Sequence, residues 1–154
     1  MDQSSPIYVR LAQLDDALDI VSFNQAMAME TENKVLPTEV INAGVRRVFS
    51  ESGLGFYVVA QSDESIVGTL MVTKEWSDWR DGLFWWIQSV YVLAEFRGRG
   101  VYRAMYQFIK EQAQHNPSVC GFRLYVEKNN HIAKRTYQAL GMNETHYLIY
   151  EQEV

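Results

Sequence analysis

The chain has 154 residues, of which 47% are apolar and 13% aromatic, so a single domain spanning residues 1–154 is expected. This composition excludes a disordered chain, and three prolines and nine glycines exclude a collagen-like one. The formal net charge is −5, with 14 basic against 19 acidic side chains. An acidic chain is a poor candidate for general nucleic-acid binding, and a cationic small substrate fits it better.

The cysteine count, the N-terminal residues and the apolar stretches indicate where in the cell the protein is expected. Cys120 is the single cysteine, which excludes an intramolecular disulfide and favours a reducing, cytoplasmic setting. The first six residues show no basic region followed by an apolar run, so no signal peptide is expected. Apolar stretches such as Leu83–Ile87 are far shorter than the roughly 20 residues that span a bilayer, so no membrane partner is expected.

The first half of the chain predicts a strand, two helices and three further strands. Asp15 and Asp16 precede apolar residues at helical spacing and are suitable caps for a helix from Ala17. The break at 36–38 separates this helix from a second one, which ends at the glycines of 52–55. The turn 62–65 is typical of a hairpin. The expected strands are Ile7–Arg10, Phe56–Gln61, Ile66–Lys74 and Leu83–Leu93.

The second half alternates helices and strands. A helix from about Gly98 to Gln114 stops at Asn116-Pro117, and a strand is expected at Phe122–Glu127. Asn129 or Asn130 can cap a helix at His131–Leu140, Gly141 suits its C-terminal cap, and His146–Glu151 resembles a final strand. The whole order predicts an α/β fold with a mixed, mostly antiparallel central sheet flanked by about four helices.

A glycine-rich turn joins the third of these central strands to the following helix. It reads Arg97-Gly98-Arg99-Gly100-Val101-Tyr102. Glycines at such a turn let backbone N–H groups approach an anion, and the helix start adds partial positive charge. The pattern indicates a pyrophosphate site, although a plain turn with two solvated arginines fits the tetrapeptide equally well. It is neither a P-loop nor a dinucleotide-binding fingerprint, and its place between two elements argues against an RNA-binding tail.

A second group of residues lies downstream on the helix predicted over His131–Leu140. Asn130, Ala133 and Tyr137 are three and four residues apart, which places them on one helix face ahead of Gly141. Taken alone, a tyrosine in such a position is more often a packed core residue. Combined with a phosphate site upstream, Tyr137 becomes a candidate for chemistry.

Together these two segments resemble the GNAT superfamily of acetyl-CoA-dependent N-acetyltransferases. The family's [RQ]-x-x-G-x-[GA] motif is matched by Arg97 and Gly100, with Tyr102 in place of the last small residue. Its second signature, N-x-x-A-x-x-x-Y-x-x-x-G-F, is matched from Asn130 to Gly141, with Met142 in place of phenylalanine. The resemblance covers the element order from Ile7 to Glu151.

The resemblance implies a binding mode for acetyl-CoA. The backbones of Val90 and Val92 would hydrogen-bond the pantetheine arm, and the N–H groups of Gly98–Tyr102 would hold the pyrophosphate. Tyr137 would protonate the departing thiolate as general acid. The implied cofactor-binding residues are Val90, Val92, Arg97, Gly98, Arg99, Gly100, Val101, Tyr102, Asn130 and Ala133.

The general base is the open part of this expectation. Polyamine-acetylating relatives often carry an acid where this chain has Gln88, and an amide is no base. The remaining candidates are Glu30 and Glu32, or an ordered water, although a solvated helix end explains both glutamates as well. The three histidines show no metal-ligand spacing, so no metal is expected.

The expected function is transfer of an acetyl group from acetyl-CoA to a primary amine of a small molecule, polyamines being one option. Alternatives are a non-catalytic acyl-CoA-binding sensor or partner module, and an acetyltransferase for protein N-termini or lysines. The acceptor and the oligomeric state stay open, and a homodimer is one option because the family is often dimeric. Trp76 and Trp79 fit an acceptor pocket or a dimer contact, whereas Trp85 and Trp86 fit the core better.

Overall fold

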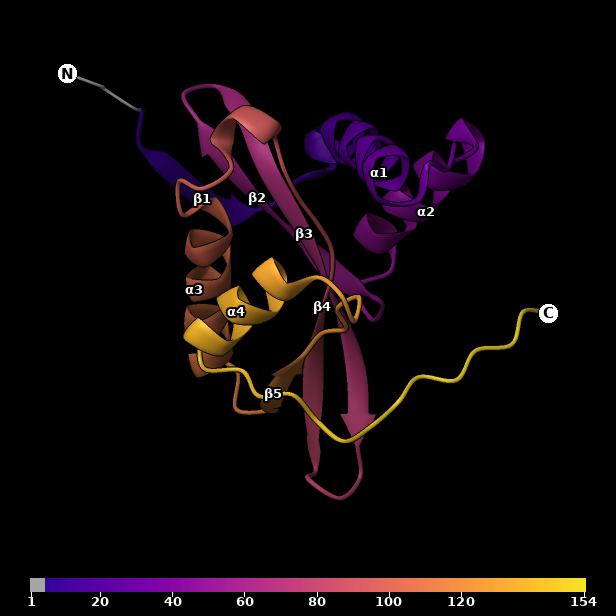
Figure 1. Ribbon diagram of the computed structural model, residues 1–154, viewed down its shortest axis with the longest axis vertical. Coiled ribbons are helices and arrows are strands. Elements are labelled where there is room, and N and C mark those ends of the chain that lie inside the picture. The colour runs from indigo at the N-terminus through magenta and orange to yellow at the C-terminus, as the bar shows by residue number, and fades with distance from the viewer. Residues whose placement is uncertain (1–4) are drawn as a thin grey trace. The chain divides into compact units, whose positions relative to one another are not determined.

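The computed structural model describes residues 5–154, and the chain divides into two compact units, Met1–Leu124 and Tyr125–Val154 (Figure 1). The larger unit contains the sheet, and the smaller one contains a single helix followed by an extended segment. The single domain expected over residues 1–154 stays a prediction.

The sheet of the larger unit has five strands in the order of the chain. Neighbouring strands are antiparallel from β1 to β4, and β5 runs parallel to β4. The expected mixed, mostly antiparallel sheet is confirmed. The strands are β1 (Ile7–Leu11), β2 (Gly55–Ser62), β3 (Ser65–Ser77), β4 (Gly82–Val92) and β5 (Val119–Arg123).

Three helices pack on this sheet. Helices α1 (Ala17–Glu32) and α2 (Thr38–Ser50) share a core with Tyr57 and Val59 of β2, so they cover one face. Helix α3 (Val101–Gln114) covers the other face, because a Cβ on Gly68 of β3 would meet the side chains of two α3 residues at 3.0 and 3.3 Å. Figure 1 shows α1 and α2 on one side of the sheet and α3 on the other.

Strand β4 is interrupted by a bulge near its end. Ser89 has a positive φ of 51°, and the pairing with β3 shifts register between Thr69 and Met71. Two β4 residues therefore oppose one β3 residue, which bends the strand locally. Strand β5 pairs with β4 only over Leu83–Trp86, so the bulge lies beyond the end of that pairing.

Strand β5 begins three residues earlier than the sequence pattern suggests, so the expected strand at Phe122–Glu127 is wrong in its bounds. The parallel register puts Gly121 beside Phe84, where a Cβ would come within 2.8 Å of the phenyl ring. Glycine weakens a strand in isolation but permits this close approach. The strand is therefore defined by its pairing with β4, a segment distant in the chain.

The smaller unit contains α4 (His131–Ala139), with both ends formed as expected. The side chain of Asn130 accepts a hydrogen bond from the Ala133 N–H at 3.1 Å, and Gly141 adopts a φ of 95° at the C-terminal cap. The final strand expected at His146–Glu151 is wrong, because these residues form no strand and Tyr147 is 68% exposed. A strand pattern produces a strand only where a partner supplies hydrogen bonds.

Candidate active site

The turn after β4 leads into α3 through two glycines in the left-handed region. A short 3-10 helix, η2 (Ala94–Phe96), follows β4, and then Gly98 and Gly100 have φ values of 74° and 78°. Glycine adopts this conformation without the steric cost that other residues meet. Helix α3 therefore starts at Val101, three residues after the expected Gly98.

The start of α3 is open in the way that an anion site requires. Gly100 is the N-cap residue and supplies no side-chain hydrogen bond to the first turn. A Cβ on Gly98 or Gly100 would meet nothing within 4 Å, so the space beside both residues is empty. The backbone N–H groups of the first turn have no partner inside the helix, and they carry its positive dipole end. These features fit a pyrophosphate.

The outer edge of β4 lies directly upstream of this turn. The Leu93 N–H bonds to the Val67 carbonyl at 2.9 Å, and hydrogen-bonded pairs alternate in an antiparallel ladder. The N–H and carbonyl of Val92 therefore point away from β3. Val90 lies in the bulge beside Ser89, where the regular alternation is interrupted. The Val92 backbone is directed to the side of β4 on which β5 has ended, which fits the expected pantetheine contact, although its carbonyl also accepts a hydrogen bond from Arg97. The contact expected at Val90 stays a prediction.

Arg97 has a different environment from the one that the sequence suggests. Its Nε donates to the Val92 carbonyl at 2.9 Å, and its Nη2 donates to Glu30 Oε2 at 2.8 Å. Its guanidinium also lies over the Tyr91 ring, 5.4 Å from the centroid. In this arrangement the guanidinium of Arg97 is bound by protein groups, and its charge is balanced by Glu30.

Glu30 is held from two sides. Besides Arg97, the Tyr91 hydroxyl donates to Glu30 Oε1 at 2.9 Å, and the Arg97 and Tyr91 hydrogen bonds lower the pKa of this carboxyl below its usual value. Tyr91 itself is only 8% exposed and packs against Phe23 of α1. Sequence reasoning missed Tyr91. Its signal was a hydroxyl-bearing residue between the two valines of the expected pantetheine contacts.

Other predicted residues of the turn have roles in packing. Val101 is 2% exposed and lies under Gly68 of the sheet. The ring of Tyr102 stands 6.2 Å from that of Tyr106 on α3, and the Arg99 guanidinium lies over Phe96 at 5.3 Å. The bulky side chain of Tyr102 is thus accommodated along α3, which leaves its backbone N–H as the group relevant to an anion.

Gln88 stands where an acidic general base would be expected, and its side chain makes a hydrogen bond within the sheet. Gln88 donates to the Thr73 hydroxyl from the sheet face covered by α1 and α2. Glu32 is the last residue of α1 and is exposed, ahead of Asn33 in the left-handed conformation. Glu30 and Glu32 therefore differ, because one is bound to Arg97 and Tyr91 and the other faces solvent.

The three residues of the second motif belong to the smaller unit. Asn130 caps α4, and Ala133 and Tyr137 follow at the spacing of one helix face. Tyr137 is half-buried, and burial raises the pKa of its phenol above the usual value. A raised pKa keeps the hydroxyl protonated at neutral pH, as a proton donor requires.

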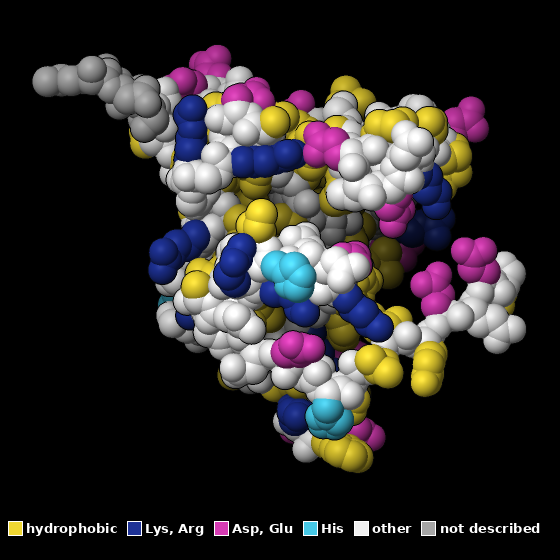
Figure 2. Space-filling model, viewed as in Figure 1, with side chains coloured by type: hydrophobic (Ala, Val, Ile, Leu, Met, Phe, Trp, Pro, Cys, Tyr) yellow, Lys and Arg dark blue, Asp and Glu magenta, His cyan; other side chains and the backbone are white. Residues whose placement is uncertain are grey.

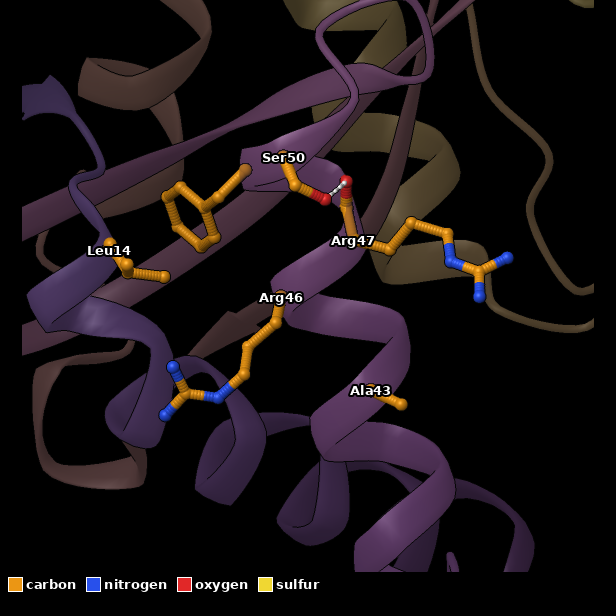
Figure 3. Close-up of a pocket in the computed structure, with 6 residues that line it drawn as sticks. Leu14, Ala43, Arg46, Arg47 and Ser50 are labelled. Atoms are coloured by element: carbon orange, nitrogen blue, oxygen red, sulfur yellow. Dashed lines mark hydrogen bonds between the residues drawn. The ribbon is translucent and has the colours of Figure 1, made fainter.

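A pocket of about 650 Å³ lies elsewhere in the larger unit and contains none of the predicted site residues. Leu14, Arg46 and Arg47 contribute to its walls, with Arg47 in the last turn of α2. Figure 3 shows that the two guanidinium groups point in different directions, so they do not converge on one anion.

Residues 5–154 show neither a metal-binding cluster nor a membrane-spanning helix. No group of three His, Cys, Asp or Glu side chains in this range is arranged to hold a metal ion. Within the same range, every helix is too short or too polar to cross a membrane. Of the four tryptophans, Trp85 is buried, whereas Trp76 and Trp79 on the β3–β4 hairpin are 59% and 90% exposed.

Comparison with known proteins identifies the family. The sequence profile of the acetyltransferase (GNAT) family matches residues 21–142, which include the turn after β4 and the motif on α4. The chain therefore belongs to the GNAT acetyltransferase family, and it is an acyltransferase by that membership. Among curated proteins, none matches the chain in sequence.

Solved structures support the same family. A crystal structure described as a possible acetyltransferase from Clostridium difficile 630 is 42% identical, covers 96% of this chain and 97% of its own, and superposes with a TM-score of 0.89. The ribosomal-protein-alanine N-acetyltransferase from Brucella melitensis biovar Abortus 2308 is 14% identical, with 97% and 99% coverage and a TM-score of 0.77. AAC(6')-Iy, solved with the bisubstrate analog CoA-S-monomethyl-acetylneamine, is 16% identical, with 97% and 99% coverage and a TM-score of 0.78. The last two show the shared fold.

Proposed function

We propose that this chain transfers the acetyl group of acetyl-CoA to a primary amine of a small molecule, by direct attack in a ternary complex. The observation that carries the proposal is the open start of α3, where Gly98 and Gly100 leave uncapped N–H groups beside empty space. The outward-facing backbone of Val92 supports it, since an extended arm attached to the pyrophosphate would run along that edge.

The proposed reaction forms one bond and breaks another. The neutral amine nitrogen bonds to the thioester carbonyl carbon, the carbon–sulfur bond breaks, and the amine loses a proton. Tyr137 gives its phenolic proton to the departing thiolate, whose pKa resembles that of cysteine at about 8.5. Backbone N–H groups at the bulged end of β4 are suited to stabilise the oxyanion that forms in between.

The proton on the acceptor amine needs a separate route. An alkylammonium with a pKa of about 10.4 is neutral in roughly one molecule in 2,500 at pH 7. Gln88 cannot take that proton. Of the two carboxylates considered, Glu32 faces solvent and Glu30 is bound to Arg97, so Glu32 or an ordered water is the better candidate for it.

The net charge of the chain supports a cationic acceptor. The chain carries a net charge of −5, and on the face in Figure 2 Lys and Arg side chains are interspersed with Asp and Glu. An acidic protein attracts a cationic acceptor over the screening length of about 8 Å at physiological salt. We therefore expect diamines and polyamines to be better acceptors than neutral monoamines of similar size.

An acceptor screen tests this function. The purified protein is incubated with acetyl-CoA and a panel of monoamines, diamines, aminoglycosides, amino acids and peptides, and thiol release and acetylated products are measured. Acetylation of a small amine with thiol release supports the proposal, and rates that fall with added salt support a cationic acceptor. Acetylated peptides alone would indicate a protein N-terminal or lysine acetyltransferase. Binding of acetyl-CoA with no thiol release for any acceptor would indicate a non-catalytic acyl-CoA-binding sensor.

A further inference from the structure

Three residues form a cluster that joins the end of α1 to the end of β4. Glu30 lies 61 residues before Tyr91 and 67 before Arg97, yet it accepts hydrogen bonds from both, at 2.9 and 2.8 Å. The ring of Tyr91 completes the cluster, with the Arg97 guanidinium 5.4 Å from its centroid. We call these three residues the Glu30 clasp.

The clasp acts on the residue that enters the turn. Arg97 stands immediately before Gly98, and its side chain is bound at two points: Nε to the Val92 carbonyl and Nη2 to Glu30. The planar guanidinium presents its donors in a fixed geometry, so these two contacts tie the residue before Gly98 to β4 and to α1. The clasp therefore restrains the path of the chain from the outer edge of β4 to the start of α3.

The side of the sheet on which the clasp lies separates it from the anion site. Tyr91 pairs with Thr69, which shares the sheet face of Val59 and therefore faces α1. Helix α3 covers the opposite face, under Gly68. The Arg97 side chain is thus held on the α1 face, and the first turn of α3 presents its N–H groups without it.

The electrostatics of Glu30 argue against proton transfer. Both of its oxygens accept hydrogen bonds, and these hydrogen bonds lower the pKa of the carboxyl. A carboxylate with a lowered pKa is a weaker base, and the ammonium of an acceptor holds its proton far more tightly. The same contacts suit a residue whose task is to hold two others in place.

We propose that Glu30 is a positioning residue that acts through Arg97 and Tyr91 to set the acetyl-CoA site, and that it is not the general base. The proposal rests on the function proposed above. Loss of the clasp should weaken coenzyme binding, because the turn and the Val92 carbonyl lose their restraint, while the chemical step at saturating acetyl-CoA is preserved.

The test compares single and double variants by calorimetry with coenzyme A and by steady-state kinetics. Glu30→Gln removes the charge, Tyr91→Phe removes only the hydroxyl, and Arg97→Lys keeps the charge but loses the two-point contact. We expect each to raise the dissociation constant and the acetyl-CoA KM by about three- to tenfold, within the range that partly exposed pairs and single hydrogen bonds reach. Glu39→Gln, an exposed glutamate in the first turn of α2, is the charge-matched control and should change neither.

Two further readouts separate positioning from catalysis. The double variant Glu30→Gln/Arg97→Lys should cost less than the product of the single effects, because both act on one contact. The kcat at saturating acetyl-CoA and the shape of its pH profile should match the wild type. Circular dichroism and thermal unfolding confirm that each variant is folded, and Tyr91→Phe is the mildest of the set.

Each remaining outcome overturns a distinct claim. A fall in kcat of a hundredfold or more for Glu30→Gln, with an unchanged acetyl-CoA KM and a lost acidic limb in the pH profile, would make Glu30 the base. Unchanged binding in all folded variants would reduce the clasp to a surface contact and leave the proposed function standing. Absence of coenzyme A binding by the wild type would overturn the proposed function, and the inference with it.

Discussion

Tyr137 is the residue on which the proposed chemistry depends most directly. Burial raises the pKa of its phenol, so the hydroxyl is protonated at neutral pH and can donate to a thiolate. Tyr137→Phe keeps the ring and deletes the donor. We expect kcat to fall by about 10²- to 10⁴-fold with acetyl-CoA binding nearly unchanged, as measured by thiol release and calorimetry.

The control for this variant comes from the same unit. Tyr147→Phe removes an exposed hydroxyl and should leave kcat unchanged. The direction of the pKa shift adds a second check, because the donor form persists to a higher pH than that of an ordinary tyrosine. Any alkaline loss of kcat that depends on Tyr137 should therefore lie above pH 10. Full activity of Tyr137→Phe would assign the proton to water instead.

At the level of elements, the start of α3 is the feature most open to a direct test. Gly100→Glu places a negative side chain in the empty space beside the first turn, where the pyrophosphate is expected. We expect coenzyme A affinity to fall by at least about tenfold, which corresponds to about 1.4 kcal/mol, in a calorimetric titration.

A matched variant separates charge from backbone strain at this glycine. Gly100 has a φ of 78°, so any side chain there adds strain of roughly 1–2 kcal/mol. Gly100→Ala adds the same strain, but its methyl group has no charge and is too short to reach the expected pyrophosphate. Its Cβ would meet nothing within 4 Å. The proposed site requires the glutamate variant to bind coenzyme A clearly more weakly than the alanine variant. Equal affinities would place the anion elsewhere.

At the scale of the whole molecule, we expect acid stability to depend on an ion pair that joins β1 to the start of α1. Asp16 is 8% exposed and accepts hydrogen bonds from both terminal nitrogens of Arg10, at 2.8 and 2.9 Å, and from the Gln13 N–H at 2.7 Å. The Arg10 hydrogen bonds, with a smaller contribution from Gln13, lower the pKa of Asp16 against the opposing effect of burial.

The direction of the Asp16 pKa shift determines the pH range in which stability is lost. A carboxyl with a lowered folded-state pKa stabilises the protein above its unfolded value of about 3.9, and this contribution disappears as the pH falls through the folded pKa. We expect Asp16→Asn to lower the free energy of unfolding by about 2 kcal/mol at pH 7 and by much less at a pH below the folded-state pKa of Asp16, in urea titrations. Asp15→Asn, at the exposed neighbouring position, should have little effect at either pH. An equal loss at both pH values would assign the effect to packing.

Local sequence determined much of this protein, because the relevant interactions join residues close together in the chain. The apolar spacing of α1, α2 and α3, the caps at Asn130 and Gly141, and the glycines before α3 all follow from such interactions. The family motifs lie within these same short segments, and the profile match over residues 21–142 bears out the resemblance that they indicate.

Tertiary structure alone decided the features that depend on distant partners. The bounds of β5 are those of its pairing with β4, in which Gly121 permits a close approach to Phe84, and the bulge at Ser89 appears only where β4 pairs with β3. The segment 146–151 has a strand pattern but no strand, because pairing is supplied by another segment or not at all. Arg97 bonds to a glutamate 67 residues away, and no local pattern encodes that choice, since it depends on how α1 lies on the sheet.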